Sequence, residues 1–235
     1  MKTIGIVGGI GPESTIEYYR SIIAAYREHT RDGSYPSIII NSINVTKMLD
    51  MIGANDLAAV THYLAGEVNR LAQAGAELGL LAANTPHIVF DEIQQQSPIP
   101  LVSIVEATCE ATRALGLTTV GLFGTRFTMQ GNFYPRVFAK QGITLVTPSP
   151  DDQDYLHAKY MSELVHGVFL PETRARLLAM AERLREQKGI QALILGGTEL
   201  PLILQDEVAA GIPLLDTTKI HVKSAVAQML SQQAA

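Results

Sequence analysis

Short runs of isoleucine, valine and leucine alternate along the chain with longer amphipathic stretches. The runs are bounded by turn residues and contain few polar positions, a pattern typical of strands that are covered on both faces of a sheet. Strands are predicted at 3–8, 36–41, 78–83, 99–103, 118–123, 142–146, 191–196 and 212–215.

Helices are predicted between these strands. Pro12 and Pro171, favoured first helical residues, open two of them, and Asn55 is the expected N-cap of another. A last helix covers about 217–231. The helix that begins at Pro12 has the predicted apolar face Ile16, Tyr19, Ile23 and Tyr26. The helix after Asn55 has Leu57, Val60, Leu64, Val68 and Leu71, and the helix that begins at Pro171 has Leu177, Leu178, Ala181 and Leu184. Strand–helix alternation of this kind predicts an α/β fold with doubly wound parallel sheets.

The chain also repeats itself. The repeated segments are Ile4–Gly8 with Val120–Gly124, Leu80–Thr85 with Leu193–Thr198, and Ile99–Val102 with Ile212–Leu215. The order is the same in both halves and the spacing is nearly constant, which indicates two similar domains related by a pseudo-twofold axis. We expect a first α/β lobe at 1–104 plus 217–235 and a second at 105–216. Because ligands of parallel sheets bind beyond the carboxyl ends of the strands, a cleft between the lobes is expected.

Composition and charge narrow the function. Apolar residues are 47% and charged residues 17% of the 235, so the chain can bury a substantial core. A net charge of −5 argues against a nucleic-acid-binding protein and against a basic membrane patch. No stretch approaches about 18 uncharged apolar residues, so no membrane span is expected. The single cysteine, Cys109, excludes an internal disulfide and is expected to be buried in a helix; the protein is expected to be cytoplasmic.

A glycine-rich segment, Gly8–Thr15, follows the first predicted strand and opens the first helix. It lacks the third glycine of a dinucleotide fingerprint, and the second strand is not followed by an acidic ribose partner, so a nucleotide cofactor is disfavoured. The loop could instead receive an anion such as a carboxylate, with Gly9 and Ser14 as binding residues. A tight turn without a ligand is the alternative.

Two further segments stand at matching places in the repeat. Asn84–His87 follows the third strand, and Thr198–Pro201 follows the seventh. Short polar groups near two helix starts favour a small carboxylate clamp, whereas simple N-capping by Thr85 and Thr198 is the alternative. Thr125, in the second-half counterpart of the glycine loop, could also donate to a carboxylate.

The titratable residues give weaker signals. The six histidines show no metal-ligand spacing, so no metal is expected, and only His87 lies in a candidate segment. A histidine just inside a helix is more often structural than catalytic. A dicarboxylate would need a local positive charge, for which Lys47, Arg126 and Lys159 are candidates.

The segments Gly8–Thr15, Asn84–His87 and Gly197–Pro201 resemble those of the aspartate/glutamate racemase family, in the same order and over essentially the whole chain. The resemblance implies two similar α/β lobes and racemisation of an amino acid without pyridoxal phosphate or any other cofactor. In that family two cysteines, one from each lobe, flank the α-carbon; one thiolate removes the proton and the opposite thiol returns one to the other face. The resemblance also implies a homodimer.

The family's cysteine positions correspond to Ala83 and Gly197 in this sequence. Three explanations stay open. Other groups, with His87 and Glu199 as the candidate catalytic residues, could move the proton; the chain could be a non-catalytic binder of a small dicarboxylate or amino acid; or its catalytic residues could have been exchanged deliberately, against which glycine at 197 argues. The expected substrate-binding residues are Gly9, Ser14, Asn84, Thr85, Thr125 and Thr198.

Overall fold

The computed structural model describes residues 1–231, which fall into two compact units. Unit 1 is Met1–Ile104 with the described residues from His221 onward, and unit 2 is Val105–Ile220. The chain passes between them in the first turns of α5 (Ile104–Ala114) and α11 (Thr217–Leu230). Positions 232–235 of the predicted first lobe lie outside the described residues. The division into lobes at 1–104 plus 217–235 and at 105–216 stays a prediction.

Unit 1 contains a four-stranded parallel sheet in the order β2-β1-β3-β4. The strands are β1 (Ile4–Gly8), β2 (Ile38–Ser42), β3 (Leu78–Leu81) and β4 (Leu101–Val102). All residues of β1 and β3 are buried, as continuous apolar runs predict for central strands.

Unit 2 contains a five-stranded sheet in the order β6-β5-β7-β9-β8. Its strands are β5 (Thr119–Gly124), β6 (Thr144–Val146), β7 (Ala192–Gly196), β8 (Val208–Ala209) and β9 (Ile212–Asp216). The sheet strands β6, β5, β7 and β9 are parallel and repeat the order of the unit 1 sheet, so the predicted α/β class with parallel sheets is confirmed. The two-residue β8, antiparallel to β9, has no counterpart among the predicted strands.

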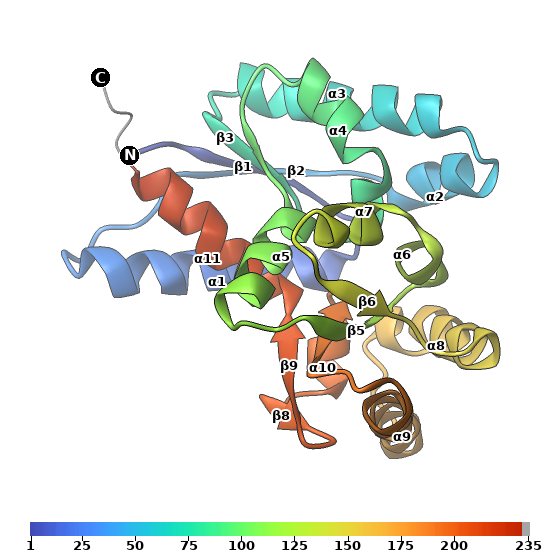
Figure 1. Ribbon diagram of the computed structural model, residues 1–235. Helices are drawn as coiled ribbons and strands as arrows, with labels where there is room; N and C mark the ends of the chain where they lie inside the picture. Colours follow the sequence, from blue (N-terminus) through green and yellow to red (C-terminus); the bar gives the residue numbers. More distant parts are fainter. Residues whose placement is uncertain (232–235) are drawn as a thin grey trace. The chain divides into compact units, whose positions relative to one another are not determined.

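The helices cover both faces of each sheet. In unit 1, α3 and α4 lie on one face and α1 on the other (Figure 1). The helical segments are α1 (Pro12–Thr30), α2 (Val45–Gly53), α3 (Leu57–Gln73), η1 (Thr85–Val89), α4 (Phe90–Gln96), α6 (Arg126–Gln130), α7 (Phe133–Ala139), α8 (Pro150–Ser162), η2 (Leu164–His166), α9 (Pro171–Lys188) and α10 (Leu200–Ile203). The predicted starts of α1 at Pro12 and of α9 at Pro171 are confirmed.

The predicted apolar face of α1 is wrong at two positions. Ile16 and Tyr19 are each 45% exposed, whereas Tyr18 and Ile22 are fully buried. The buried stripe follows an i, i+4 spacing through Tyr18, Ile22 and Tyr26. Tyr18 can lie inside because its hydroxyl finds a buried hydrogen-bond partner, which the spacing of apolar residues cannot reveal.

The predicted start of α3 is displaced by one residue. Asp56, not Asn55, is the N-cap, and its carboxylate accepts a hydrogen bond from the Ala59 N–H at 2.9 Å. Asn55 adopts a left-handed conformation with φ 56°. Of the predicted buried residues, Leu57 is only half-buried, while the other four are confirmed in the core.

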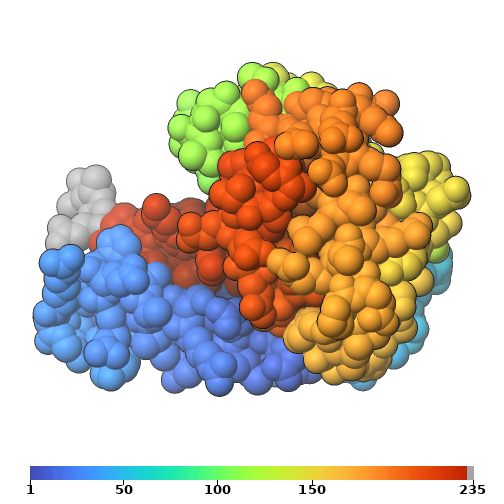
Figure 2. All heavy atoms as spheres, turned by 90° about the horizontal axis from the view of Figure 1, so that it is seen from below, coloured from blue at the N-terminus to red at the C-terminus, as the bar shows by residue number. Residues whose placement is uncertain are grey.

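The core of unit 1 joins the two ends of the chain. Ile4, Ile6, Tyr18 and Ile22 pack in one cluster with apolar residues of the last helix, among them Val226. Figure 2 accordingly shows the blue surface of α1 bordering the red surface of α11. The last helix is therefore an integral part of unit 1.

The core of unit 2 packs α8 and α9 against the sheet. One buried cluster joins residues of β5, α8, α9 and β7, among them Phe123, Leu156, Leu177 and Leu195. Cys109 is buried in α5, as predicted, and burial raises the pKa of its thiol. The candidate site residues of unit 2 come directly after two strands of this core: Thr125 after β5, and Gly197, Thr198 and Glu199 after β7.

Candidate active site

The glycine loop after β1 is held by contacts within the chain. Gly9 has φ +76°, and its N–H donates to the Thr15 hydroxyl at 2.8 Å. That hydroxyl in turn donates to the Gly11 carbonyl at 3.2 Å. Ser14 is buried at the start of α1. Thr15, which the sequence analysis did not single out, thus fixes the turn, and the roles of Gly9 and Ser14 in substrate binding stay predictions.

The segment after β3 places three predicted residues together in unit 1. Ala83 and Asn84 are buried and Thr85 is half-buried, directly after the strand. Pro86 lies in the first turn of η1, a 3₁₀ helix. The N-cap position of η1 is Asn84 rather than Thr85, and the Asn84 side chain makes no cap hydrogen bond.

His87 uses both of its ring nitrogens inside unit 1. Nε2 accepts a hydrogen bond from the Ile104 N–H at 3.1 Å, so Nδ1 carries the proton and donates to the Ala83 carbonyl at 3.0 Å. The ring is 1% exposed and stacks on Phe90 with centroids 4.8 Å apart. Burial is the larger cause and the nearby His221 the second, and together they lower the pKa of His87 to about 3. The geometry favours a structural role for His87 over that of a proton carrier.

His221 forms a second buried histidine site beside it. Nε2 donates to the Val102 carbonyl at 2.9 Å, so Nδ1 accepts from the Tyr18 hydroxyl at 2.8 Å. The two imidazoles lie edge to face with centroids 6.2 Å apart. Burial lowers the pKa of His221 to about 4. Both rings are therefore neutral near pH 7 and act as hydrogen-bond connectors within unit 1.

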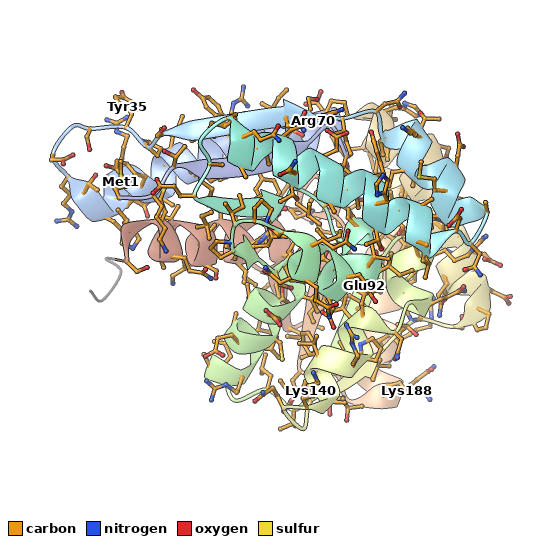
Figure 3. All side chains as sticks on the ribbon, turned by 90° about the horizontal axis from the view of Figure 1, so that it is seen from above. Met1, Tyr35, Arg70, Glu92, Lys140 and Lys188 are labelled. Atoms are coloured by element: carbon orange, nitrogen blue, oxygen red, sulfur yellow. The ribbon has the colours of Figure 1, made fainter. Side chains whose placement is uncertain are left out.

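A buried carboxylate on α3 is also structural. Glu67 accepts from the Asn41 amide at 2.8 Å and from the Arg70 guanidinium at 2.7 Å. Figure 3 labels Arg70 on α3, and its side chain is 69% exposed while that of Glu67 is 7% exposed. The charge of Glu67 is thus balanced next to the strand end, as a buried carboxylate requires.

The end of β7 in unit 2 brings together a carboxylate and two hydroxyls. Glu199 is 4% exposed, and its Oε2 accepts a hydrogen bond from the Thr198 hydroxyl at 2.9 Å. The same oxygen accepts a hydrogen bond from the Tyr160 hydroxyl of α8. The pKa of Tyr160 is raised well above its usual value. Burial is the larger cause and the charge of Glu199 is the second. The resting arrangement is a neutral phenol that donates to a buried carboxylate.

Gly197 leaves the space that this phenol uses. A Cβ added at Gly197 would lie 2.6 Å from Cε2 and 2.7 Å from Oη of Tyr160. These separations are shorter than van der Waals contact. The absence of a side chain at 197 and the position of the Tyr160 ring therefore depend on each other.

The predicted cationic partners are engaged elsewhere. Arg126 pairs with Asp154 at 2.8 Å, Lys159 pairs with Glu163, and the Lys47 ammonium lies 4.5 Å from the Tyr63 ring centroid. Thr125 is the N-cap of α6, where its side chain accepts from the Thr128 N–H. A role for any of these residues with a carboxylate ligand stays a prediction.

One pocket of about 340 Å³ lies in unit 2, and none of the predicted site residues lines it. Its lining is Leu195, Pro201, Leu204, Gln205, Asp206, Glu207, Leu214, Leu215, Asp216, Lys219 and Ile220. Within residues 1–231, no three His, Cys, Asp or Glu side chains gather as metal ligands would, and no helix has the length and apolar character needed to cross a bilayer.

The family model described as Asp/Glu/hydantoin racemase matches residues 7–225. The chain belongs to this family. The broad specificity amino-acid racemase RacX of Bacillus subtilis (strain 168) is 26% identical over 98% of this chain and 99% of its own length. Family membership identifies the chain as a racemase-like isomerase.

Solved structures of racemase relatives share its fold. A proposed Asp/Glu racemase from Yersinia pestis matches with a TM-score of 0.90 and 31% identity, covering 98% of this chain and 100% of that one. An aspartate racemase homologue from Pyrococcus horikoshii OT3 matches with a TM-score of 0.85 and 34% identity over the same shares. The racemase fold therefore extends over nearly the whole chain.

Within each unit of this racemase fold, the structure brings some of the predicted residues together. Ala83, Asn84 and His87 lie together in unit 1, and Thr198 and Glu199 lie together in unit 2. Tyr160, which contacts Glu199, was missed by the sequence analysis. It lies on a helix far from any motif, and the only sequence signal was the unexplained glycine at 197.

Adding a methyl group at Gly197 of this racemase relative tests the mutual dependence of Gly197 and Tyr160. Gly197→Ala is expected to lower the free energy of unfolding by about 2 kcal/mol, because the Cβ displaces a buried ring. In a Tyr160→Leu background, the same change should cost less than about 1 kcal/mol. Urea unfolding of the four proteins of this double-mutant cycle measures the difference. An equal cost in both backgrounds would contradict the contact.

Proposed function

We propose that this protein is an isomerase that moves the proton at the α-carbon of a small acidic amino acid or a related carboxylate, without pyridoxal phosphate. The observation that carries the proposal is the buried Glu199 carboxylate at the end of β7, with two hydroxyl groups donating to it. Such a group can take up and return a proton next to a strand end, where ligands of parallel sheets bind.

Family membership supports the type of reaction. The matching family model describes amino-acid and hydantoin racemases, and RacX of Bacillus subtilis is named as a broad specificity amino-acid racemase. Racemisation requires that a proton leave one face of the α-carbon and return to the other. The proposal includes that Ala83 and Gly197 stand where the two cysteines of the family would stand, so other groups carry the proton here.

The second candidate function is a non-catalytic binder of a small dicarboxylate or amino acid. Two observations in unit 1 favour it. Position 83 is an alanine, which offers no proton, and both nitrogens of His87 are occupied by hydrogen bonds to the chain. Under this alternative, Asn84, Thr85 and Thr198 would hold the ligand and no proton would move.

The proposal carries further expectations. The partner is a small carboxylate or amino acid rather than a nucleic acid or a membrane, in keeping with the net charge of −5. We propose a homodimer that acts in the cytoplasm with no cofactor.

Proton exchange in heavy water separates the two functions. The purified protein is incubated with L- and D-aspartate, L- and D-glutamate and a panel of neutral amino acids in D₂O, and the α-proton signal is followed by NMR. We expect loss of the signal for an acidic amino acid, with chiral analysis showing inversion. Thermal stabilisation by a compound whose α-proton never exchanges would favour the binder and contradict the isomerase.

A further inference from the structure

The Tyr160 ring lies against the backbone at the end of β7, although Tyr160 belongs to none of the sequence motifs. It enters from α8 and fills the space beside the backbone of Gly197, where a side chain at 197 would otherwise lie. Tyr160 is 5% exposed, so the ring is held in place by packing rather than left mobile at the surface. Its hydroxyl is thereby fixed at the carboxyl end of β7, the end at which parallel sheets bind ligands.

The hydroxyl is also connected to a proton acceptor. It donates to Oε2 of Glu199, and the Thr198 hydroxyl donates to the same oxygen at 2.9 Å. Each of these hydroxyl groups offers a hydrogen-bonded route by which a proton can reach this oxygen. A phenol loses its proton far more readily than the hydroxyl of threonine, so Tyr160 is the better intermediary.

We propose that Tyr160 and Glu199 form the proton-carrying pair of unit 2, with the Tyr160 oxygen as the atom that touches the substrate. This inference rests on the proposed function and names the residue that performs it. In the forward step, the Tyr160 oxygen takes the proton from the substrate α-carbon while its own proton passes to Glu199. The electron pair of the broken C–H bond stays on the substrate carbon and is shared with its carboxylate. The reverse step restores the C–H bond, the phenol and the ionised carboxylate.

The resting charge state suits this step. Burial and the adjacent carboxylate raise the pKa of Tyr160, so the phenol stays protonated near neutral pH. The proton therefore moves from substrate to carboxylate without a free tyrosinate beside a second negative charge, which a buried site would strongly disfavour. The glycine at 197 has a direct reason in this scheme, since any larger residue would push the phenol away from the strand end.

The test compares Tyr160→Phe with a matched control on the same helix. Tyr155 is half-buried on α8 and lies beside Arg176 rather than Glu199, so Tyr155→Phe removes an equivalent hydroxyl outside the site. Exchange of the aspartate and glutamate α-protons in D₂O is measured for the parent and both variants, with kcat and KM determined separately. Tyr160→Phe is expected to lower kcat by about 100-fold or more with KM changed less than about threefold. Tyr155→Phe should match the parent.

Glu199→Gln is the second variant, since the amide keeps the shape and can still accept the Tyr160 hydrogen bond but cannot take up a proton. We expect it to lose exchange to a similar degree while remaining folded by circular dichroism. If the parent exchanges and Tyr160→Phe exchanges equally fast, the inference is overturned while the proposed function stands. If the parent exchanges without inverting configuration and Tyr160→Phe is inactive, the pair is supported and the isomerase proposal fails. A parent that exchanges neither amino acid overturns both for these substrates.

Discussion

Lowering the pH from 7 to 5 is expected to reduce the free energy of unfolding by about 4 kcal/mol, because two buried histidines must stay neutral in the folded protein. The pKa of His87 is lowered to about 3 and that of His221 to about 4. In the unfolded chain both side chains take up protons near the ordinary value of about 6.5. Between these values the unfolded state binds more protons than the folded state, so stability falls as the pH falls.

Between pH 5 and pH 7 His157 contributes in the same direction, because its partial burial also lowers its pKa. Carboxylates with lowered pKa values, such as Glu163 with its Lys159 and Thr173 partners, lose stabilisation only at lower pH. Urea unfolding at half-unit pH steps measures the slope, which should approach that of two protons near pH 5. His221→Gln should reduce the slope by about half. A flat profile over this range would contradict the neutral buried pair.

Gly9→Ala is expected to lower the free energy of unfolding by about 4 kcal/mol. Gly9 has φ +76°, a conformation that costs an alanine about 1–2 kcal/mol. In addition, the new Cβ would lie 2.7 Å from the Ile43 backbone nitrogen and nearer still to the Ile43 carbonyl oxygen. Backbone cannot rotate out of the way as a side chain can, so the strand end and the loop must both shift.

Gly33→Ala is the matched control for this substitution. Gly33 has a nearly identical φ of +79°, but a Cβ there meets no atom within 4 Å. It should therefore cost only the conformational part, about 1 kcal/mol. Thermal and urea unfolding of both variants separates the two contributions. If Gly9→Ala cost no more than Gly33→Ala, the close approach of the backbone to Gly9 would be disproved.

The sequence was most informative where burial is uniform. The central strands β1 and β3 are apolar throughout because helices cover both faces of their sheet, and this gave their positions to within a few residues. The buried face of α1 was less predictable. Tyr18 is buried because its hydroxyl donates a hydrogen bond to His221, a residue 203 positions away in the sequence. Spacing of apolar residues contains no information about such a partner.

The candidate site was predictable only near its motifs. Glu199 was identified because it stands beside Thr198 after a strand, and the structure places both hydroxyl and carboxylate in contact. His87 was named for its side-chain chemistry, but the Ile104 N–H occupies the nitrogen that a base would need. Tyr160 was missed because its contact with Glu199 joins residues 39 positions apart.

The contribution of the last helix to the core of unit 1 has a consequence for synthesis. Val222, Val226 and Met229 pack with Ile4 and Tyr18, so residues 1–104 lack part of their apolar partner until α11 has been synthesised. Unit 2 is continuous from Val105 to Ile220, so all of its residues are synthesised before Val222, Val226 and Met229. The order of maturation should thus run against the order of translation, with the amino-terminal half the last to close.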